Sequence, residues 1–292
     1  MVKFRPGGPA GPVEDRRGQG GGGFGGLPIG IGKVGGLTGL IGLLVALFLG
    51  GSSIFSGGGS GINIPGLPGV QSPVTRDPNL ADPQADQVTF VKLALGDIEA
   101  TWQSIFANAG GPQWEPTTLV LYTDVTDTGC GTGEAATGPF YCPVDRKVYL
   151  DLGFFNELTT RFAAPGDLAE AYVIAHEVGH HVQNLLGISA KVSEHEQADP
   201  SSANAWSVKL ELQADCFAGV WAHSAYAAGE LQAGDLQEAL AAAAAVGDDR
   251  LQQQAGRAVN PDSFTHGSSE QRVSWFTKGY DQGDPNTCDT FA

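Results

Sequence analysis

Apolar residues recur every three or four positions in two long stretches of the chain, which is the spacing of a helix that buries one face. The first stretch begins at Val88 and ends at residues 110–112, Gly-Gly-Pro. The second runs from Asp167 to Gly187, where Asp167 and Glu170 have the spacing of an N-terminal capping box and Gly187 is a C-terminal stop. The pattern therefore predicts two helices that each lie on a hydrophobic core.

Shorter patterns complete the predicted fold. They indicate strands where β-branched and aromatic residues gather, helices where the apolar spacing is three or four, and a loop where polar residues dominate. The predicted elements are strands at residues 117–122 and 147–152, helices at 153–162, 210–221 and 235–246, a helix that starts at Ser268 in a capping box with Gln271, and a loop at 191–203. These elements predict an α+β class that is mostly helical with a small sheet.

The N-terminal part of the chain has a different composition. Residues 1–33 are rich in Gly, Pro and Arg, and their basic residues outnumber the acidic ones, so we expect a disordered basic head. Residues 34–55 are apolar, uncharged and long enough to cross a hydrocarbon core of about 30 Å as a helix. We expect a transmembrane anchor there; a cleaved signal peptide and an apolar linker are the alternatives. Residues 56–85 form a Gly/Pro-rich tether.

Composition limits the remaining possibilities. The chain has 292 residues, of which 41% are hydrophobic, so it can hold one large core, which we expect at residues 86–292. Its net charge of −16 argues against a nucleic-acid partner. The basic head before the apolar run predicts a single-pass cell-membrane protein with its N-terminus in the cytoplasm and its folded domain outside.

The second helix carries a candidate metal site. His176, Glu177 and His180 form the pattern His-Glu-x-x-His. Residues four apart lie one turn above one another, so both imidazoles can bind one tetrahedral Zn²⁺. Glu177 is too close along the chain to be the natural third ligand, but its carboxylate can act as general base on a water at the metal. The alternative is a pair of ordinary histidines on an amphipathic helix.

A second pattern supplies the missing ligand. Glu211 and Asp215 are four residues apart on the helix predicted at 210–221, so their side chains share one face. Glu211 can complete a His, His, Glu set around zinc. Asp215 can accept the free ring N–H of a ligating histidine and so fix its tautomer. His181 and His195 lack such support: we expect a packing or hydrogen-bonding role for the first and a surface loop for the second.

The cysteines are Cys130, Cys142, Cys216 and Cys288. They contain no Cys-x-x-Cys pair, and an even number of cysteines outside the cytoplasm favours disulfide bonds. The simplest pairing joins Cys130 to Cys142 and leaves Cys216 for Cys288. Two other pairings remain open, as do four reduced and buried thiols.

At these residues the chain resembles the neutral zinc metallopeptidases of bacteria, which are zincins whose third ligand is a glutamate in Glu-x-x-x-Asp. The resemblance covers the chain from Asp86 to its end and rests on four segments. They are GPFYCPVDRKVYLDLGFF at 138–155, HEVGHH at 176–181, ELQADCFAGVWA at 211–222 and THGSSEQRVSWF at 265–276. The metzincin pattern is excluded, because Gln183 and Leu186 occupy its glycine and third histidine positions. The resemblance implies a zincin-like fold with residues 147–152 as an edge strand beside the cleft; an ordinary strand of the sheet is the alternative.

The predicted activity is hydrolysis of peptide bonds in a peptide or protein substrate. A zinc-activated water whose pKa falls to about 7 would attack, with Glu177 as its general base. His266 lies at a predicted helix start and is a catalytic candidate that would stabilise the oxyanion, with Tyr141 and Arg272 as competitors. For each of the three, a structural hydrogen bond is the alternative role. The alternative function is a non-catalytic, zinc-stabilised scaffold or binding module, which a blocked cleft would favour.

Overall fold

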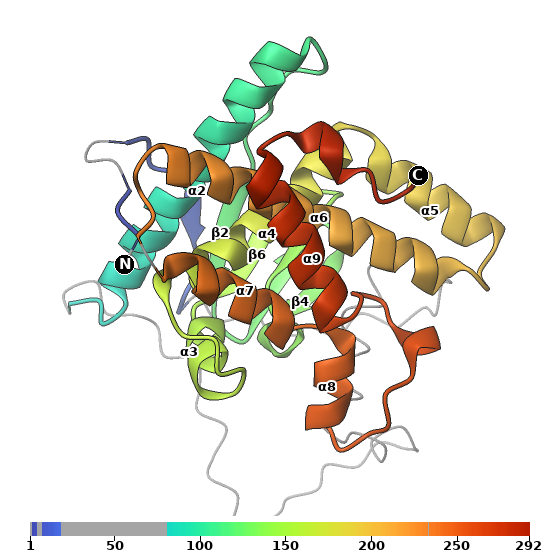
Figure 1. Ribbon diagram of the computed structural model, residues 1–292. Helices are drawn as coiled ribbons and strands as arrows, with labels where there is room; N and C mark the ends of the chain where they lie inside the picture. The colour runs from blue at the N-terminus through green and yellow to red at the C-terminus, as the bar shows by residue number, and fades with distance from the viewer. Residues whose placement is uncertain (1, 5–7, 19–80, 233) are drawn as a thin grey trace, which may run out of the picture.

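A four-stranded sheet lies behind the helices in the computed structural model, which describes residues 2–4, 8–18, 81–232 and 234–292 (Figure 1). The strand order is β1-β2-β6-β5, with β1, β2 and β6 parallel and β5 antiparallel to β6. The strands are β1 (Val13–Asp15), β2 (Thr118–Tyr122), β5 (Phe140–Cys142) and β6 (Lys147–Asp151), and a separate hairpin pairs β3 (Val125–Thr128) with β4 (Gly131–Glu134).

Helix α4 is at the centre of the helical part. It contacts α2, α6 and α7 as well as strands β5 and β6, and most of its residues are buried. The helices are α2 (Ala85–Ala109), α3 (Gly153–Thr160), α4 (Asp167–Leu185), α5 (Ile188–Ala198), α6 (Ala203–Ala227), α7 (Asp235–Ala245), α8 (Asp248–Gln254) and α9 (Ser269–Gln282). The mostly helical α+β class is therefore confirmed.

Helices α6 and α9 cross at very short range. A Cβ added to Gly279 of α9 would lie 2.0 Å from the carbonyl oxygen of Cys216 on α6, which is well inside contact distance. Only glycine permits this approach, because any side chain there would push the two backbones apart. In the N-terminal half of α9, Arg272 reaches Asp215, so α9 also packs against the part of α6 that carries the acidic pattern of residues 211–215.

Most predicted elements are confirmed, including the capping box of Ser268 with Gln271 and the stop of α4 at Gly187, whose φ is 73°. Two local predictions are wrong. Residues 191–203 are largely helical, because α5 extends to Ala198. The capping box at the start of α4 is absent: Glu238 of α7 accepts the backbone N–H of Leu168 at 3.0 Å instead.

The described part of residues 1–33 is not a disordered head. Strand β1 pairs with β2, and the oxygen of Pro9 lies against α2 at Gly96, where an added Cβ would be only 1.8 Å away. The guanidinium of Arg17 is buried and pairs with Asp82 at 2.9 Å, just before α2. Residues 8–18 are thus part of the domain, which corrects its predicted start at residue 86.

The predicted anchor, residues 34–55, lies outside the described residues. Among the residues that the structure describes, none of the helices is long and apolar enough to span a bilayer. The pairing of β1 with β2 places both strands on the same side of any membrane. A single crossing between residues 18 and 81 would separate them, so the predicted topology, with the N-terminus and the domain on opposite sides, does not fit this sheet.

Two disulfide bonds staple the domain. Cys130 pairs with Cys142, which joins the β3–β4 hairpin to strand β5, and Cys216 pairs with Cys288, which joins α6 to η3 (Pro285–Cys288). The simplest predicted pairing is therefore confirmed. The predicted edge strand is not, because β6 lies between β2 and β5 and is an interior strand.

Candidate active site

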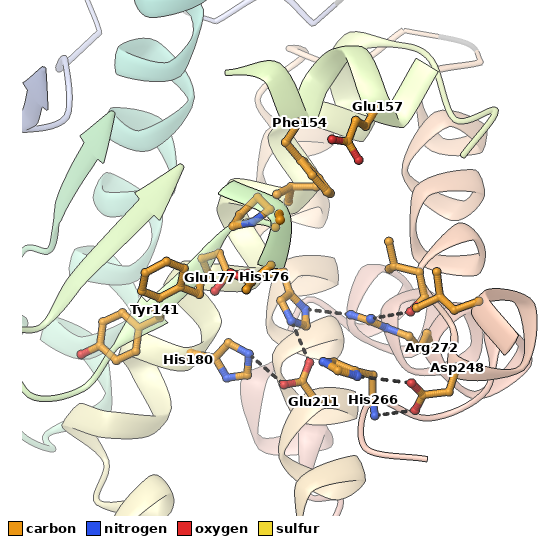
Figure 2. Close-up of a pocket in the computed structure, with 18 of the residues that line it drawn as sticks. Tyr141, Phe154, Glu157, His176, Glu177, His180, Glu211, Asp248, His266 and Arg272 are labelled. Atoms are coloured by element: carbon orange, nitrogen blue, oxygen red, sulfur yellow. Dashed lines mark hydrogen bonds and ion pairs between the residues drawn. The ribbon is translucent and has the colours of Figure 1, made fainter. Parts of the chain in front are cut away.

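Helices α4 and α6 bring the three predicted metal ligands together. His176 and His180 are one turn apart on α4 and face Glu211 of α6 (Figure 2). His176 Nε2 lies 3.1 Å from Glu211 Oε2, and His180 Nε2 lies 3.4 Å from Glu211 Oε1. Ligands at zinc distances of 2.0–2.1 Å in a tetrahedron are separated by about 3.3 Å, so the Glu211 carboxylate lies from each histidine at about the spacing that the ion requires.

Asp215 binds the ring nitrogen of His176 that faces away from the metal site. Its Oδ1 lies 2.9 Å from His176 Nδ1 and also accepts the hydroxyl of Tyr172 at 2.5 Å, while Arg272 donates to both of its oxygens at 2.8 and 2.9 Å. Burial alone raises the pKa of Asp215, but the charges of Arg272 and His176 lower it further than burial raises it. An ionised Asp215 only accepts hydrogen bonds, so Nδ1 of His176 carries its proton and Nε2 faces the metal site.

Neutral groups hold the other histidine. His180 Nδ1 lies 2.8 Å from the side-chain oxygen of Gln183, which is fully buried one turn further along α4. The sequence indicated Asp215 through its spacing from Glu211, but it offered no such signal for Gln183.

Glu177 lines the same cavity as the ligands. Figure 2 shows it beside His176, on the side of the cluster that faces the strands. Only 8% of Glu177 is exposed, and this burial raises the pKa of its carboxyl, although the neighbouring histidines oppose the effect. A carboxylate with a raised pKa is a suitable proton acceptor near neutral pH.

His266 also reaches the cavity, from the loop before α9. Asp248, the first residue of α8, organises this loop: its Oδ2 accepts the backbone N–H groups of Thr265, His266 and Gly267 at 2.7, 2.7 and 3.1 Å. The other oxygen of Asp248 lies 3.3 Å from His266 Nδ1. Burial lowers the pKa of His266, but the charges of Glu211 and Asp248 more than offset this, so that the pKa is raised.

The two predicted competitors of His266 are engaged elsewhere. The Tyr141 hydroxyl lies 2.9 Å from His181 Nδ1 and accepts a hydrogen bond from Asn184. Figure 2 shows this hydroxyl pointing away from Glu211. Arg272 is committed to Asp215. Of the three candidates, His266 therefore remains the one that can stabilise the oxyanion, because its ring lies beside Glu211 (Figure 2).

His181 and His195 follow the sequence expectations in part. His181 is buried, and its Nε2 lies 2.6 Å from the backbone oxygen of Glu115, so its hydrogen-bonding role is confirmed. His195 does not join the metal cluster: it lies on α5 rather than in a loop and stacks on Trp206 with ring centroids 4.1 Å apart. Asp248, which holds His266, was missed because no motif links it to the catalytic segments.

A cavity of about 590 Å³ opens in front of the ligand cluster. The β3–β4 hairpin and residues 135–141 form one wall, and α3, α8 and the start of α4 form the others. Much of its lining is apolar, including Phe140, Phe154, Phe162, Val173 and Leu251. The cavity reaches the metal ligands, and within the part of the chain that the structure describes no segment blocks the cleft, as the scaffold alternative would require.

Comparison with known proteins agrees with this geometry. The family described as "Putative neutral zinc metallopeptidase" has a model that matches residues 2–291. The chain belongs to this family. Its metal is zinc, and His176, His180 and Glu211 are the residues that would hold the ion.

The family match includes the N-terminal segment that carries β1. "Uncharacterized protein YpfJ" of Escherichia coli (strain K12) is 48% identical over 284 residues, which cover 96% of this chain and 95% of the relative. "Uncharacterized protein Rv2575" of Mycobacterium tuberculosis (strain ATCC 25618 / H37Rv) is 45% identical over 223 residues, or 71% of this chain and 73% of the relative. No solved structure matches the chain.

Proposed function

We propose that the chain is a zinc-dependent peptidase that hydrolyses peptide bonds with Glu177 as general base. One observation carries this proposal: a buried carboxylate and a His, His, Glu cluster of zinc-binding size face the same accessible cavity. A structural zinc site is closed by four protein ligands, whereas a catalytic site has three and an open position. In the part of the chain that the structure describes, the cluster consists of three.

Bound zinc would supply Lewis-acid chemistry, polarising the substrate carbonyl and lowering the pKa of a water to about 7. Glu177 would take the proton of that water and deliver it to the leaving amine. His266 lines the cavity and would donate a hydrogen bond to the oxyanion, with Asp248 fixing both its ring and its loop. Asp215 and Gln183 keep the ligating histidines in the tautomer with Nε2 free.

Strand β5 is the element best placed to bind the substrate backbone. It pairs with β6 on one side, and none of the described strands pairs with its other side. Phe140 and Tyr141 of β5 line the cavity. A peptide in extended form can pair with such an edge and place its side chains alternately against the walls. The apolar wall then favours a peptide with an apolar side chain near the scissile bond.

We also propose that the domain works outside the cytoplasm. The support is the two disulfide bonds, since such bonds persist in oxidising compartments and are rare in the cytosol. Because β1 belongs to the same sheet, the N-terminal strand shares that compartment.

Replacing Glu177 by Gln tests the proposed reaction. The amide keeps the shape of the side chain but cannot accept the proton, so kcat should fall on the order of 10² or more while zinc stays bound. Hydrolysis of a peptide library and zinc stoichiometry are measured on the same samples. Glu170→Gln on the same helix, outside the cavity, is the matched control and should retain activity. Wild-type turnover in Glu177→Gln would refute the mechanism. A wild-type protein that binds zinc but cleaves no library peptide would favour the scaffold function.

A further inference from the structure

We infer that Gln183 and Gln213 are positioning residues that relay the placement of the Cys216–Cys288 disulfide to the metal ligand His180. This inference rests on the zinc site of the proposed function. A continuous chain of hydrogen bonds carries it: His180 Nδ1 to Gln183 Oε1 is 2.8 Å, Gln183 Nε2 to Gln213 Oε1 is 3.1 Å, and Gln213 Nε2 to the Cys288 oxygen is 3.0 Å.

The direction of every bond in this relay is fixed by two backbone carbonyls. Gln183 Nε2 also donates to the carbonyl oxygen of Leu210 at 2.7 Å, and Gln213 Nε2 donates to that of Cys288. A carbonyl oxygen can only accept, so each amide must turn its nitrogen toward it. Turning either amide around would bring two acceptors together in the buried interior.

This fixed direction determines the tautomer of His180. Because the nitrogen of Gln183 faces Leu210 and Gln213, its oxygen must face His180 Nδ1. An amide oxygen accepts, so Nδ1 must carry a proton, and in the ring that binds a metal Nε2 is the nitrogen left to supply the lone pair. Nε2 is the atom that faces Glu211 at 3.4 Å. The relay therefore presets which nitrogen of His180 faces the metal site, without using any charged group.

The far end of the relay is anchored covalently. Cys288 is fully buried in η3, and its disulfide joins it to Cys216 of α6, the same helix that carries Gln213 and Glu211. The disulfide thus fixes the Cys288 carbonyl relative to the third metal ligand. Gln183 and Gln213 are 0% and 5% exposed, so water does not replace the carbonyl if it moves away. Zinc affinity should consequently depend on this disulfide.

The first test measures zinc affinity by competition with a chromophoric chelator on the full chain. Gln183→Leu and Gln213→Leu should each weaken zinc binding by about 10-fold, near the lower limit for partners of metal ligands. The Co²⁺-loaded variants should also show an altered visible spectrum, which reports ligand geometry rather than stability. Asn184→Leu, next to Gln183 on α4, changes an amide that bonds Tyr141 instead and should bind zinc as the wild type does.

Gln213 makes its hydrogen bonds to Gln183 and Cys288 and not to a metal ligand. The Gln213→Leu variant therefore tests the relay even if Gln183→Leu does not fold. Wild-type zinc affinity and an unchanged Co²⁺ spectrum in Gln213→Leu would overturn the relay. These readouts do not involve hydrolysis: a protein that binds zinc but cleaves no peptide refutes the proposed function, while the relay is still judged by the zinc affinities.

The second test adds the disulfide. The pair Cys216→Ala and Cys288→Ala should weaken zinc binding about as much as Gln213→Leu does. The same pair introduced into the Gln213→Leu variant should then change zinc affinity little further, because the relay is already broken. Effects that simply multiply would show that the disulfide acts on the site by another route and would overturn the coupling.

Discussion

The two histidine ligands perform the same task but are supported by opposite chemistry. His176 is hydrogen-bonded to an ionised network, in which Asp215 accepts hydrogen bonds from Arg272 and the Tyr172 hydroxyl. His180 is hydrogen-bonded to a chain of neutral side-chain amides, which donate in turn to backbone carbonyls. Both supports are buried, and both leave Nε2 of the ring facing Glu211.

The difference has consequences for what each support tolerates. Charged groups bind one another strongly in the interior, but removing one partner leaves the other as an uncompensated buried charge. When a chain of neutral hydrogen bonds is interrupted, one hydrogen bond is lost. The polar group left unpaired is uncharged, so its burial costs less free energy. Changes on the His176 side should therefore affect both zinc binding and folding, whereas changes on the His180 side should act mainly on zinc.

Glu211 belongs to both sides, and its loss should have the largest effect. Each of its oxygens faces one histidine, so Glu211→Ala removes a ligand and the partner of both rings. We expect the purified variant to lose most of its zinc and to melt at a lower temperature, because metal binding adds to folding free energy. Zinc stoichiometry and melting temperature, with and without chelator, measure this. Full zinc retention would mean that the third ligand is misassigned, and His266 would be tested next.

Asp215→Ala breaks only the His176 side. It should weaken zinc binding about 10- to 100-fold, with zinc still bound when supplied in excess. It should also lower the free energy of unfolding by about 3–5 kcal/mol, since Arg272 is left buried without its carboxylate. Chemical denaturation of the metal-free protein measures the second effect.

The double variant Asp215→Ala with Arg272→Met separates the two effects. Removing the stranded guanidinium should restore much of the stability, while zinc affinity stays low. If stability is not restored, the charge imbalance is not its cause.

A smaller effect follows from proton competition on the His176 side. Burial alone lowers the pKa of His176, but Asp215 and Glu211 together raise it to about 10 in the metal-free domain. Zinc must displace that proton, so zinc affinity should rise by up to about tenfold per pH unit until pH approaches 10.

The stability of the metal-free domain should change in the opposite direction with pH. The stabilising pair of His176 with Asp215 is fully present below about pH 6.5 and is lost as pH rises toward 10. Zinc titrations and metal-free melting curves across this range check both signs. Asp215→Asn should flatten the two pH profiles, and unchanged profiles would contradict the role given to Asp215.

The sequence predicted the parts of the site that are local. His176, Glu177 and His180 share one helix, as do Glu211 and Asp215, so spacing alone placed each group on one face. Partners that come from distant segments carried no such signal. Asp248 reaches His266 only through the tertiary fold.

The fold, too, was predictable where it depends on local sequence and not where it depends on contacts between distant segments. Amphipathic spacing predicted α2 and α4, but the cap of α4 comes from Glu238, which lies on another helix. A three-residue strand such as β1 is too short for an alternating pattern to stand out. Its place in the sheet depends on pairing with β2, far along the chain, which local sequence does not encode.

The pairing of β1 with β2 also sets an order of assembly. Strand β1 leaves the ribosome first, yet its partner β2 is made only after the whole of α2. Contacts between such distant segments form slowly, because a long loop must be closed before they gain anything. Until β1 arrives, the backbone of β2 is an unpaired sheet edge, with its buried leucines close behind. A nascent chain in which β1 has not yet docked therefore exposes a site for pairing with other chains, and docking of this N-terminal strand is the step that removes it.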